Sequence, residues 1–394
     1  MADLSRHWQL DPAIEFLNHG SFGACPGKVL EAQQEIRREI EREPVEFFVR
    51  RFAEKLDRAR ERLAAFLGAD PEGLVTVSNA TTGVNAVLRS RRFSPGEELL
   101  VTDHAYNACR NAVEFVASRS GLRVVVASVP FPIAGPDEAL EAILGAATPR
   151  TTLALIDHVT SQTGLILPLK AIVEGLADRG IDTLVDGAHA PGMLPLGVEE
   201  IGAAYYAGNC HKWLCAPKGA GFLWVRSDFR DQVRPLTISH GANTHRQGRS
   251  RLHNEFDWMG TDDPSAFLSV PTSIEFLESL VPGGWPEIIR RNHELALAGR
   301  RILADALDVE PPCPDEMIGS LAALPLPDGS SEPPESPLYT DPLQETLFRE
   351  HRIEVPVVPW PVPPKRLLRI SAQLYNREEQ YERLGAALRL ERSA

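Results

Sequence analysis

Short runs of β-branched and leucine residues alternate with helix-like segments through the middle of the chain. Each strand-like run is followed by a segment whose apolar residues recur with helical spacing. The runs lie at 74–77, 98–102, 124–129, 152–157 and 183–186, and the helices begin near Val84, Ala108, Asp137 and Leu169. This alternation predicts an α/β fold with a mostly parallel central sheet and helices on both faces.

The carboxyl ends of these strands are the expected place for a binding site. In an open parallel sheet, ligands bind beyond the carboxyl ends of the strands. Polar residues follow three of the predicted strands at that edge: Asp103, His104 and Tyr106; His158 and Thr160; Asp186 and His189. We therefore expect functional residues to come from these groups.

The residues before the first strand divide into an irregular arm and a helical region. Residues 1–25 contain, in their second half, the Asn and Gly residues of a turn without helical spacing. A helical pattern then runs from Lys28 to Leu67 with an interruption at Pro44, and Gly68 provides a stop. We expect an N-terminal arm followed by helices.

The C-terminal part of the chain has a less regular pattern. After a strand-like run at 222–225, residues 237–263 are rich in His, Gly, Asn and Arg and are expected to form a long functional loop. Helical segments at 271–280 and 287–307 are expected to begin a smaller α+β domain.

Two Pro-rich segments lie inside that second domain. Residues 324–343 carry many Pro, Ser, Asp and Glu residues and are predicted to be mobile. The prolines of 355–364 predict an extended polyproline-like run, and a strand-like run follows at 367–370. The expected organisation is an N-terminal arm (1–25), a large domain (26–265) and a small C-terminal domain (266–394).

Composition and charge narrow the class of protein. The chain has 394 residues, of which 43% are hydrophobic, as expected for a globular protein with a sizeable core. Its formal net charge of -13 argues against nucleic acid as the main partner, because phosphate binding needs clustered positive charge. No segment has the pattern of a signal peptide or a membrane span, so we expect a cytoplasmic protein without a membrane partner.

The cysteines indicate neither a disulfide framework nor a metal site. The chain has five cysteines, an odd number that is sparse and widely spread, which is typical of reduced thiols. Cys210, His211 and Cys215 are close in sequence, but no second ligand pair completes a zinc pattern. We therefore expect no metal.

The most unusual segment is 205–221, which places Lys212 between a histidine and a tryptophan. The segment is too rich in Gly, Pro and small residues to be a plain helix. A lysine packed among apolar and aromatic groups loses part of its charge, and the neutral amine can attack a carbonyl carbon. The alternative is an ordinary lysine whose aliphatic stem lies along Trp213.

Asp186 and Lys212 together indicate a specific chemistry. A carboxylate at the end of a buried strand needs a cationic or hydrogen-bonding partner. With a pyridine cofactor between them, the carboxylate could keep the ring nitrogen protonated while the lysine forms a Schiff base, the pair that pyridoxal phosphate uses as an electron sink. The turn at 78–83 could bind the phosphate at a helix N-terminus, although Thr81 or Thr82 could equally be an ordinary helix cap.

Four short motifs contain these candidate residues and their neighbours: Asp186-Gly187-Ala188-His189, Asn209-Cys210-His211-Lys212-Trp213, Gly260-Thr261 and Arg369-Ile370-Ser371. Together they resemble the class V aminotransferase family of fold-type I pyridoxal-phosphate enzymes. Within it, the lysine block and the arm sequence Leu17-Asn18-His19-Gly20-Ser21-Phe22-Gly23 resemble the isopenicillin N epimerase-like branch. The resemblance covers nearly the whole chain and is weakest from Gly283 to Ile353.

The resemblance implies pyridoxal 5'-phosphate as the cofactor and gives roles to the residues around it. Lys212 would form the Schiff base, and Asp186 would pair with the pyridine nitrogen. His189 would lie near the phenolic oxygen of the ring, as would Thr160, where many relatives have Asn. The residues expected at the phosphate are Ala80, Thr81, Asn209 (often Ser in relatives), His211 and, from the second subunit of a homodimer, Thr261.

The resemblance also implies how the ring and an amino-acid substrate would be held. The residue stacked on the ring is usually His; His104, Ala105 and Tyr106 compete for that position, and we favour Tyr106. Arg369 would bind the substrate α-carboxylate, a bidentate task that suits its planar guanidinium. Two residues of the arm are expected to contact the same substrate: Asn18 and His19.

The family supports several reactions, and the residues argue against one of them. Cysteine desulfurases of the family need a nucleophilic Cys before the substrate arginine, and residues 352–369 contain none. The remaining reactions begin with removal of the Cα proton by Lys212. We favour β-elimination by a C-S lyase on a cysteine-derived thioether or sulfoxide, because an epimerase also needs a second acid such as Tyr106 or His104. The alternatives are an epimerase of the isopenicillin N type, an aminotransferase and a non-catalytic protein of this fold.

Overall fold

The central sheet confirms the predicted α/β architecture. The computed structural model describes residues 3–246, 248–332 and 340–393. The strands are β2 (Leu74–Val77), β3 (Glu98–Thr102), β4 (Arg123–Ala127), β5 (Thr151–Asp157), β6 (Asp182–Gly187), β7 (Tyr205–Asn209) and β8 (Gly221–Val225). Their order in this seven-stranded sheet is β2-β8-β7-β6-β5-β3-β4. β8 is antiparallel to both its neighbours, and all other pairs are parallel.

Helices cover both faces of this sheet, because both faces of its strands are apolar. Successive strand residues point to opposite faces. Leu99 and Val101 belong to one buried cluster, whereas Leu100 belongs to the other. The first cluster includes α4 (Ala80–Ser90), α5 (Asn107–Ser120) and α9 (Arg251–Phe256). The second includes α3 (Phe52–Leu67), α6 (Pro136–Ala146), α7 (Leu169–Ala177) and α11 (Val270–Leu280).

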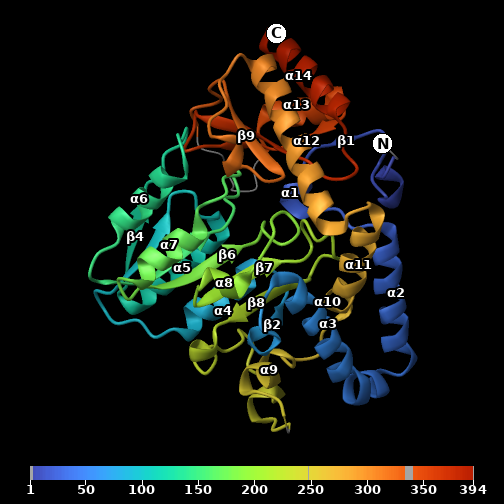
Figure 1. Cartoon of the computed structure of the whole chain (residues 1–394), viewed down its shortest axis with the longest axis vertical. Helices are drawn as coiled ribbons and strands as arrows, with labels where there is room; N and C mark the ends of the chain where they lie inside the picture. Colours follow the sequence, from blue (N-terminus) through green and yellow to red (C-terminus); the bar gives the residue numbers. More distant parts are fainter. Residues whose placement is uncertain (1–2, 247, 333–339, 394) are drawn as a thin grey trace.

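A second, three-stranded sheet lies with several helices at one end of the molecule, opposite α9 (Figure 1). Its order is β11-β12-β9, and both pairs are antiparallel. The elements here are β9 (Leu321–Leu326), β11 (Val357–Pro359), β12 (Arg366–Ser371), α12 (Gly284–Leu307), α13 (Pro342–His351) and α14 (Glu378–Ser393). α12 packs against α14 and β9. This arrangement agrees with the predicted α+β character.

The N-terminal arm is more regular than predicted, because distant segments complete its hydrogen bonds. β1 (Glu15–Phe16) pairs in parallel with β10 (Ile353–Glu354), and a single helical turn, α1 (His19–Phe22), follows. Gly20 N donates to Ser371 Oγ of β12 over 3.0 Å. The arm is therefore joined to the C-terminal part of the chain.

The helices after the arm agree with the sequence pattern. α2 (Gly27–Arg42) ends before Pro44, a π-helical turn (Glu46–Arg51) follows, and α3 then runs to Leu67. Gly68 adopts a left-handed conformation with φ 60° at the end of α3, as the predicted stop requires. No helix in the described ranges is long and apolar enough to cross a membrane.

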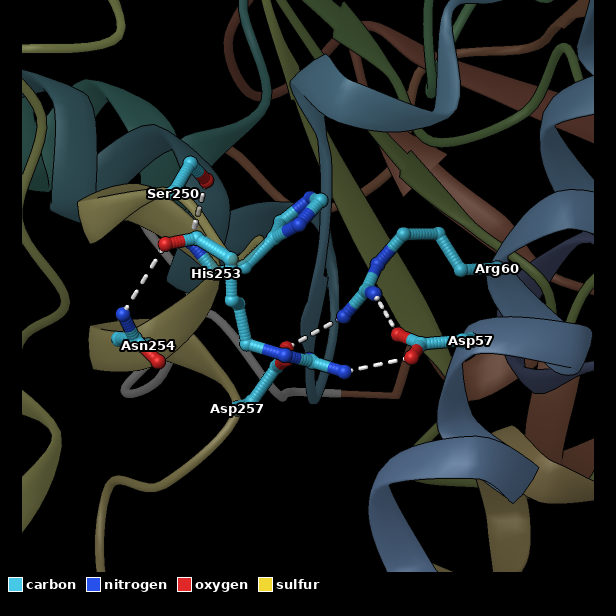
Figure 2. Close-up of polar contacts among 7 residues, drawn as sticks. Asp57, Arg60, Ser250, His253, Asn254 and Asp257 are labelled. Carbon is cyan, nitrogen blue, oxygen red and sulfur yellow. Dashed lines mark hydrogen bonds and ion pairs between the residues drawn. The ribbon is translucent and has the colours of Figure 1, made fainter. Parts of the chain in front are cut away.

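Part of the predicted loop 237–263 is a buried helix, which corrects the sequence-based expectation. Leu252 and Phe256 on α9 are each 2% exposed and pack in the cluster of α4 and α5. Ser250 caps the helix by accepting a hydrogen bond from the N–H of His253 (Figure 2). The many polar residues of this stretch made the helical spacing of Leu252 and Phe256 difficult to recognise in the sequence.

A ring of ion pairs holds α9 against α3. Arg60 of α3, which is 2% exposed, donates to Asp57 over 2.6 Å and to Asp257 over 2.5 Å. Arg249 contacts the same two carboxylates, so that acids and bases alternate around the ring (Figure 2). Burial of Arg60 is tolerated because its charge is paired on both sides.

Three further sequence-based expectations are corrected. Asn79, rather than Thr81 or Thr82, caps α4, because its Oδ1 accepts from the Thr82 N–H over 2.9 Å. Val357–Pro359 is a strand rather than a polyproline run, since β12 supplies a partner. Of the segment predicted to be mobile, the first residues belong to β9 and the last to α13, and residues 333–339 lie outside the described residues.

Candidate active site

The candidate site lies beyond the carboxyl ends of β5, β6 and β7. The chain leaves β7 at Asn209, forms a compact loop that carries Lys212, and returns at Gly221 into β8. The loop is closed by the Cys210 N–H, which donates to the carbonyl oxygen of Ala220 over 3.0 Å. Its antiparallel return explains why Lys212 is held at the edge of the sheet rather than on a flexible connection.

Lys212 and His189 face one another. Lys212 Nζ lies 3.0 Å from His189 Nε2. Burial lowers the pKa of Lys212 to about 8, although the nearby Asp186 carboxylate favours its charged form. Burial, together with the charge of Lys212, brings the pKa of His189 well below its usual value, so the imidazole is neutral. The site therefore combines a neutral histidine with a lysine whose amine is partly available near neutral pH.

Asp186 ends β6 as a buried carboxylate with two hydrogen bonds. Its Oδ1 accepts from the Ala188 N–H over 3.0 Å, and its Oδ2 accepts from the Cys109 thiol over 3.1 Å. Asp157 is its register partner on β5. Burial, and then the charge of Asp186, raise the pKa of Asp157 well above its usual value. The two neighbouring carboxyl groups therefore make ionisation of Asp157 unfavourable.

Cys109 and Asp157 are site residues that the sequence analysis missed. Asp157 is the last residue of β5 and Asp186 is the last but one of β6, so the same positional rule could have found Asp157. Cys109 lies on α5 and is separated from Asp186 by a long stretch of sequence, so no local sequence pattern predicts their contact.

The start of α4 forms one end of the site. The Ala80 N–H donates to Asn209 Oδ1 over 2.8 Å, which joins two of the predicted phosphate residues. Thr81 follows in the first turn, where the helix dipole favours an anion, although the N–H groups of Thr82 and Gly83 donate to Asn79 over 2.9 and 3.2 Å. His211 Nδ1 lies 3.1 Å from the carbonyl oxygen of Ala220, and burial lowers its pKa to about 4.

Two other predicted cofactor residues have different surroundings. Thr160 is fully buried, and its hydroxyl lies 2.7 Å from Thr163 Oγ1 and accepts from the Leu165 N–H over 2.8 Å. Its hydroxyl is therefore used within its own turn. Thr261 is exposed on the stretch between α9 and α10 (Ser265–Leu268).

Arg369 brings β12, the arm and the loop after β5 together. Its Nη1 donates to the carbonyl oxygen of Ser161 over 2.7 Å, and its Nη2 donates to Ser21 Oγ over 2.8 Å and to Asn18 Oδ1 over 3.5 Å. Its buried Nε has no partner among the described residues. Burial lowers the pKa of Arg369 to about 10, which leaves it charged at neutral pH. A buried, incompletely paired guanidinium suits a carboxylate ligand.

His19 lies behind the lysine rather than in an accessible position. It is fully buried, and its Nδ1 accepts from the Ala24 N–H over 3.3 Å and lies 2.8 Å from the Tyr375 hydroxyl. Its Nε2 is 3.1 Å from the carbonyl oxygen of Lys212. This position differs from the substrate contact expected of His19. The His19 side chain has no exposed surface and supports the lysine loop instead.

The arm closes over the lysine loop at Gly23. This residue has φ 70°, and a Cβ there would lie 2.1 Å from the carbonyl oxygen of His211. Lys218 Nζ donates to the carbonyl oxygen of Gly23 over 2.9 Å. Only glycine allows this close approach, so the arm is part of the site's framework.

Tyr106 and His104 are now distinguished by their surroundings. Both ring nitrogens of His104 have partners, Thr163 Oγ1 at 2.8 Å and the carbonyl oxygen of Val129 at 3.0 Å. Tyr106 is 42% exposed at the start of α5. Burial of its hydroxyl raises the pKa of Tyr106, to which Asp186 contributes, whereas Arg369 acts in the opposite direction. Tyr106 is therefore the more exposed of the two, and its hydroxyl is influenced by Asp186 and Arg369 of the site.

The cysteines are separate thiols. All five are free and buried. No group of three or more His, Cys, Asp or Glu side chains that could hold a metal ion occurs within the part of the chain that the structure describes.

Comparisons with known proteins agree with this architecture. The family model described as Aminotransferase class-V matches residues 24–316. The chain is 37% identical to isopenicillin N epimerase of Amycolatopsis lactamdurans, and the alignment covers 96% of both chains. It is 33% identical to a probable chloroplastic L-cysteine desulfhydrase of Arabidopsis thaliana, over 98% of this chain and 84% of that one.

A solved structure shares the fold. The cystine C-S lyase C-DES, in complex with its product cysteine persulfide, superposes with a TM-score of 0.77 at 21% identity, covering 95% of this chain and 97% of that chain. A mutant of C-DES carries glycine covalently linked to its PLP cofactor. The fold is that of the fold-type I pyridoxal-phosphate enzymes. The chain belongs to the class V aminotransferase family.

The family and the fold indicate pyridoxal 5'-phosphate as the cofactor, and the residues present fit it. The buried Asp186 carboxylate can pair with a pyridinium nitrogen, and Lys212 is a partly neutral amine suited to an aldehyde carbon. The start of α4, where the helix dipole is positive and Asn209 lies against Ala80, suits a phosphate.

Proposed function

We propose that the protein removes the Cα proton of an α-amino acid and eliminates a sulfur group from its Cβ, with pyridoxal phosphate as cofactor. The observation that carries this proposal is the placement of Lys212 beside the neutral His189, with Asp186 and Arg369 close enough to affect its charge. Relatives that include a probable L-cysteine desulfhydrase and a hercynylcysteine sulfoxide lyase support a cysteine-derived substrate such as a thioether or sulfoxide.

Arg369 binds the substrate carboxylate in this proposal. Its guanidinium is buried, so an ion pair with a carboxylate is little weakened by water. Ser21 and the Ser161 carbonyl oxygen, its present partners, fix the plane of the guanidinium. Asn18 accepts from the Ser21 hydroxyl over 2.5 Å and so positions that contact.

Pyridoxal phosphate, when bound, supplies an electron sink for the electron pair at Cα. With pyridoxal phosphate bound, Asp186 would pair with the protonated ring nitrogen, beside Asp157, whose pKa burial raises well above its usual value. His189 would lie near the phenolic oxygen, Tyr106 would stack on the ring, and Thr160 supports the turn beside it. Ala80, Thr81, Asn209 and His211 would hold the phosphate, together with Thr261 of a second copy.

Lys212 performs the proton transfers. Its neutral amine takes the Cα proton, and the electron pair forms the Cα–Cβ double bond as the Cβ–S bond breaks. The sulfur leaves as a thiolate or sulfenate, and the Lys212 ammonium returns a proton to it. The remaining fragment is hydrolysed by water to pyruvate and ammonia, so no oxidant or reductant is required.

The alternative is an epimerase, and one observation favours it. The chain shares 37% identity with an isopenicillin N epimerase along almost its full length. Tyr106 would then be the second acid that delivers a proton to the opposite face of Cα. An aminotransferase or a non-catalytic protein has no comparable support from the site residues.

A homodimer with shared active sites is part of the proposal. Thr261 is exposed, and apolar side chains on the nearby N-terminal helical region are exposed as well, with Val45 at 57% and Val49 at 70%. A second copy would cover these side chains and receive Thr261 at its phosphate. We further propose a cytoplasmic location.

Incubation with S-substituted cysteines tests the proposed reaction. Elimination releases pyruvate together with a thiol or sulfenate, whereas exchange of the α-hydrogen with deuterated solvent, with inversion and no fragmentation, supports the epimerase. Borohydride should fix the cofactor on Lys212 in the wild type and in Lys170→Ala, a change at an exposed lysine, but not in Lys212→Ala. A protein that gains no absorbance with added pyridoxal phosphate contradicts both enzyme functions.

A further inference from the structure

The indole of Trp213 determines which ring nitrogen of His189 carries the proton. Trp213 is 1% exposed, and its Nε1 donates to His189 Nδ1 over 3.4 Å. An indole nitrogen can only donate a hydrogen bond, so Nδ1 must be the acceptor. Since His189 is neutral, its single ring proton is then on Nε2.

The proton on Nε2 points toward the lysine. His189 Nε2 lies 3.0 Å from Lys212 Nζ. A lysine ammonium has donors but no acceptor, whereas the neutral amine has a lone pair. A donating Nε2–H therefore repels the charged form of Lys212 and binds the neutral one.

The surroundings of Trp213 keep its indole in place. The ring of His19 lies against it with a centroid separation of 4.9 Å. His19 itself is fixed between the Tyr375 hydroxyl and the carbonyl oxygen of Lys212. The indole thus has little freedom to turn its N–H away from His189.

We infer that Trp213 is a positioning residue, which fixes the His189 tautomer so that Nε2–H faces Lys212 and favours the neutral amine. The tautomer follows from the contacts alone. Only the use of the neutral amine, which is to react with the aldehyde of the cofactor, rests on the proposed function. Trp213 does not contact Lys212 Nζ in this arrangement and acts on it only through His189.

Other charged and titratable groups also act on this pair. Those that influence Lys212 are Asp186, Arg369, Cys109 and Asp157, and those that influence His189 are Lys212, Arg369, His19 and His211. None of these groups is altered by replacing Trp213 with Phe. A comparison of Trp213→Phe with and without His189 therefore separates the loss of the indole N–H from the loss of packing against His19.

Nitrogen NMR of protein labelled with ¹⁵N-histidine reads the tautomer directly, with His189→Gln used to assign the signal. We expect His189 of the wild-type chain to carry its proton on Nε2, and Trp213→Phe to transfer a measurable fraction to Nδ1. Trp224→Phe is the matched control, because Trp224 is also buried but its Nε1 has no partner among the described residues. A wild-type protein protonated on Nδ1, or an unchanged tautomer in Trp213→Phe, would overturn the inference.

The capture of pyridoxal phosphate by the cofactor-free full-length chain gives the second measurement. In Trp213→Phe we expect the pH midpoint of capture to rise by about one unit, which reduces capture at pH 7 about tenfold. In the His189→Gln background the same change should have no effect, because an amide has no tautomer to fix. An equal loss in both backgrounds would show a packing effect and reject the inference. If no variant captures the cofactor, the proposed function fails, while the NMR result still decides the tautomer.

Discussion

The thiol of Cys109 donates a hydrogen bond to Asp186 over 3.1 Å, and thereby joins helix α5 to the carboxylate at the end of β6. The carboxylate accepts a second hydrogen bond from the Ala188 N–H. Both donors stabilise its negative charge, which the proposed pyridinium partner requires. A cysteine in this position acts as a hydrogen-bond donor rather than as a nucleophile.

Cys109→Ala should therefore weaken catalysis while leaving the fold intact. Loss of one donor to a charged acceptor is expected to lower kcat/KM about tenfold, equivalent to about 1.4 kcal/mol. Cys109→Ser should retain most activity because a hydroxyl also donates. Steady-state kinetics measure the effect, and Cys313→Ala, which removes another buried thiol, serves as the control. Equal losses in the Ala and Ser variants would point to packing instead of hydrogen bonding.

Arg369→Lys should raise KM at least tenfold with a smaller change in kcat. A lysine keeps the charge but cannot make the two parallel hydrogen bonds of a guanidinium to a carboxylate. Arg366→Lys is the matched control, since it lies on the same strand but pairs with Asp341 over 2.7 Å. Substrate titrations of both variants test this expectation, and a KM that rises equally in both would reject a carboxylate-binding role for Arg369.

Tyr106→Phe separates the two proposed reactions. Phe keeps an aromatic ring but removes the hydroxyl, so elimination by Lys212 should stay within a few-fold of the wild type. Inversion of an amino-acid substrate should be nearly abolished if Tyr106 is the second acid. Chiral chromatography and pyruvate release measure the two outcomes on the same samples. Tyr205→Phe, within β7, provides the control, and unchanged inversion in Tyr106→Phe would remove that residue from the acid role.

Arg60→Met should destabilise the protein strongly, because it leaves the buried carboxylate of Asp257 with one cation fewer. Removal of one partner from a buried ion pair costs about 3–5 kcal/mol. Chemical denaturation measures the change in the free energy of unfolding. Arg58→Met, on the same helix but with an exposed side chain paired to Glu54, should change it by less than about 1 kcal/mol. Similar values for both variants would contradict a stabilising role for the ring in Figure 2.

The buried carboxylate of Glu98 should make stability depend on acid pH. Burial alone would raise its pKa, but hydrogen bonds from Thr148, Arg123 and Arg150 outweigh burial and bring the pKa of Glu98 down to about 2. Because this pKa is lower than the usual 4.5, the stabilisation is present above pH 4.5 and is lost as the pH falls toward 2.

Thermal unfolding of Glu98→Gln tests the predicted direction of the change in stability with pH. The wild type should be more stable than the variant at pH 7, and the difference in Tm should shrink between pH 4.5 and 2. Glu97→Gln, at the neighbouring position, is the control for a general effect of removing a carboxylate. A constant difference between wild type and Glu98→Gln across this range would contradict the explanation.

The fold could be predicted largely from local patterns. The strands of the central sheet are apolar on both faces, so they read as short continuous runs, and Lys212 and Asp186 lie at positions that parallel sheets assign to ligands. What could not be predicted were contacts between segments far apart in sequence. Ser21 and Ser161 meet at Arg369 only because the arm, the loop after β5 and β12 converge.

The errors of the sequence analysis have the same origin. α9 was taken for a loop because its charged neighbours have their partners on α3. The family resemblance implied a substrate contact for His19, whereas the partners of its ring nitrogens, Tyr375 and the Lys212 carbonyl oxygen, come from other parts of the chain. The position and role of a polar residue can be predicted from sequence only when its hydrogen-bonding partner is known.

The pairing of β1 with β10 has a consequence for biosynthesis. The arm is synthesised long before β10 and β12, which it contacts. Arg369 therefore cannot form its hydrogen bond with Ser21 of the arm until more than three hundred intervening residues have been made. The contacts between the arm and β12 should accordingly be among the late ones to form during synthesis.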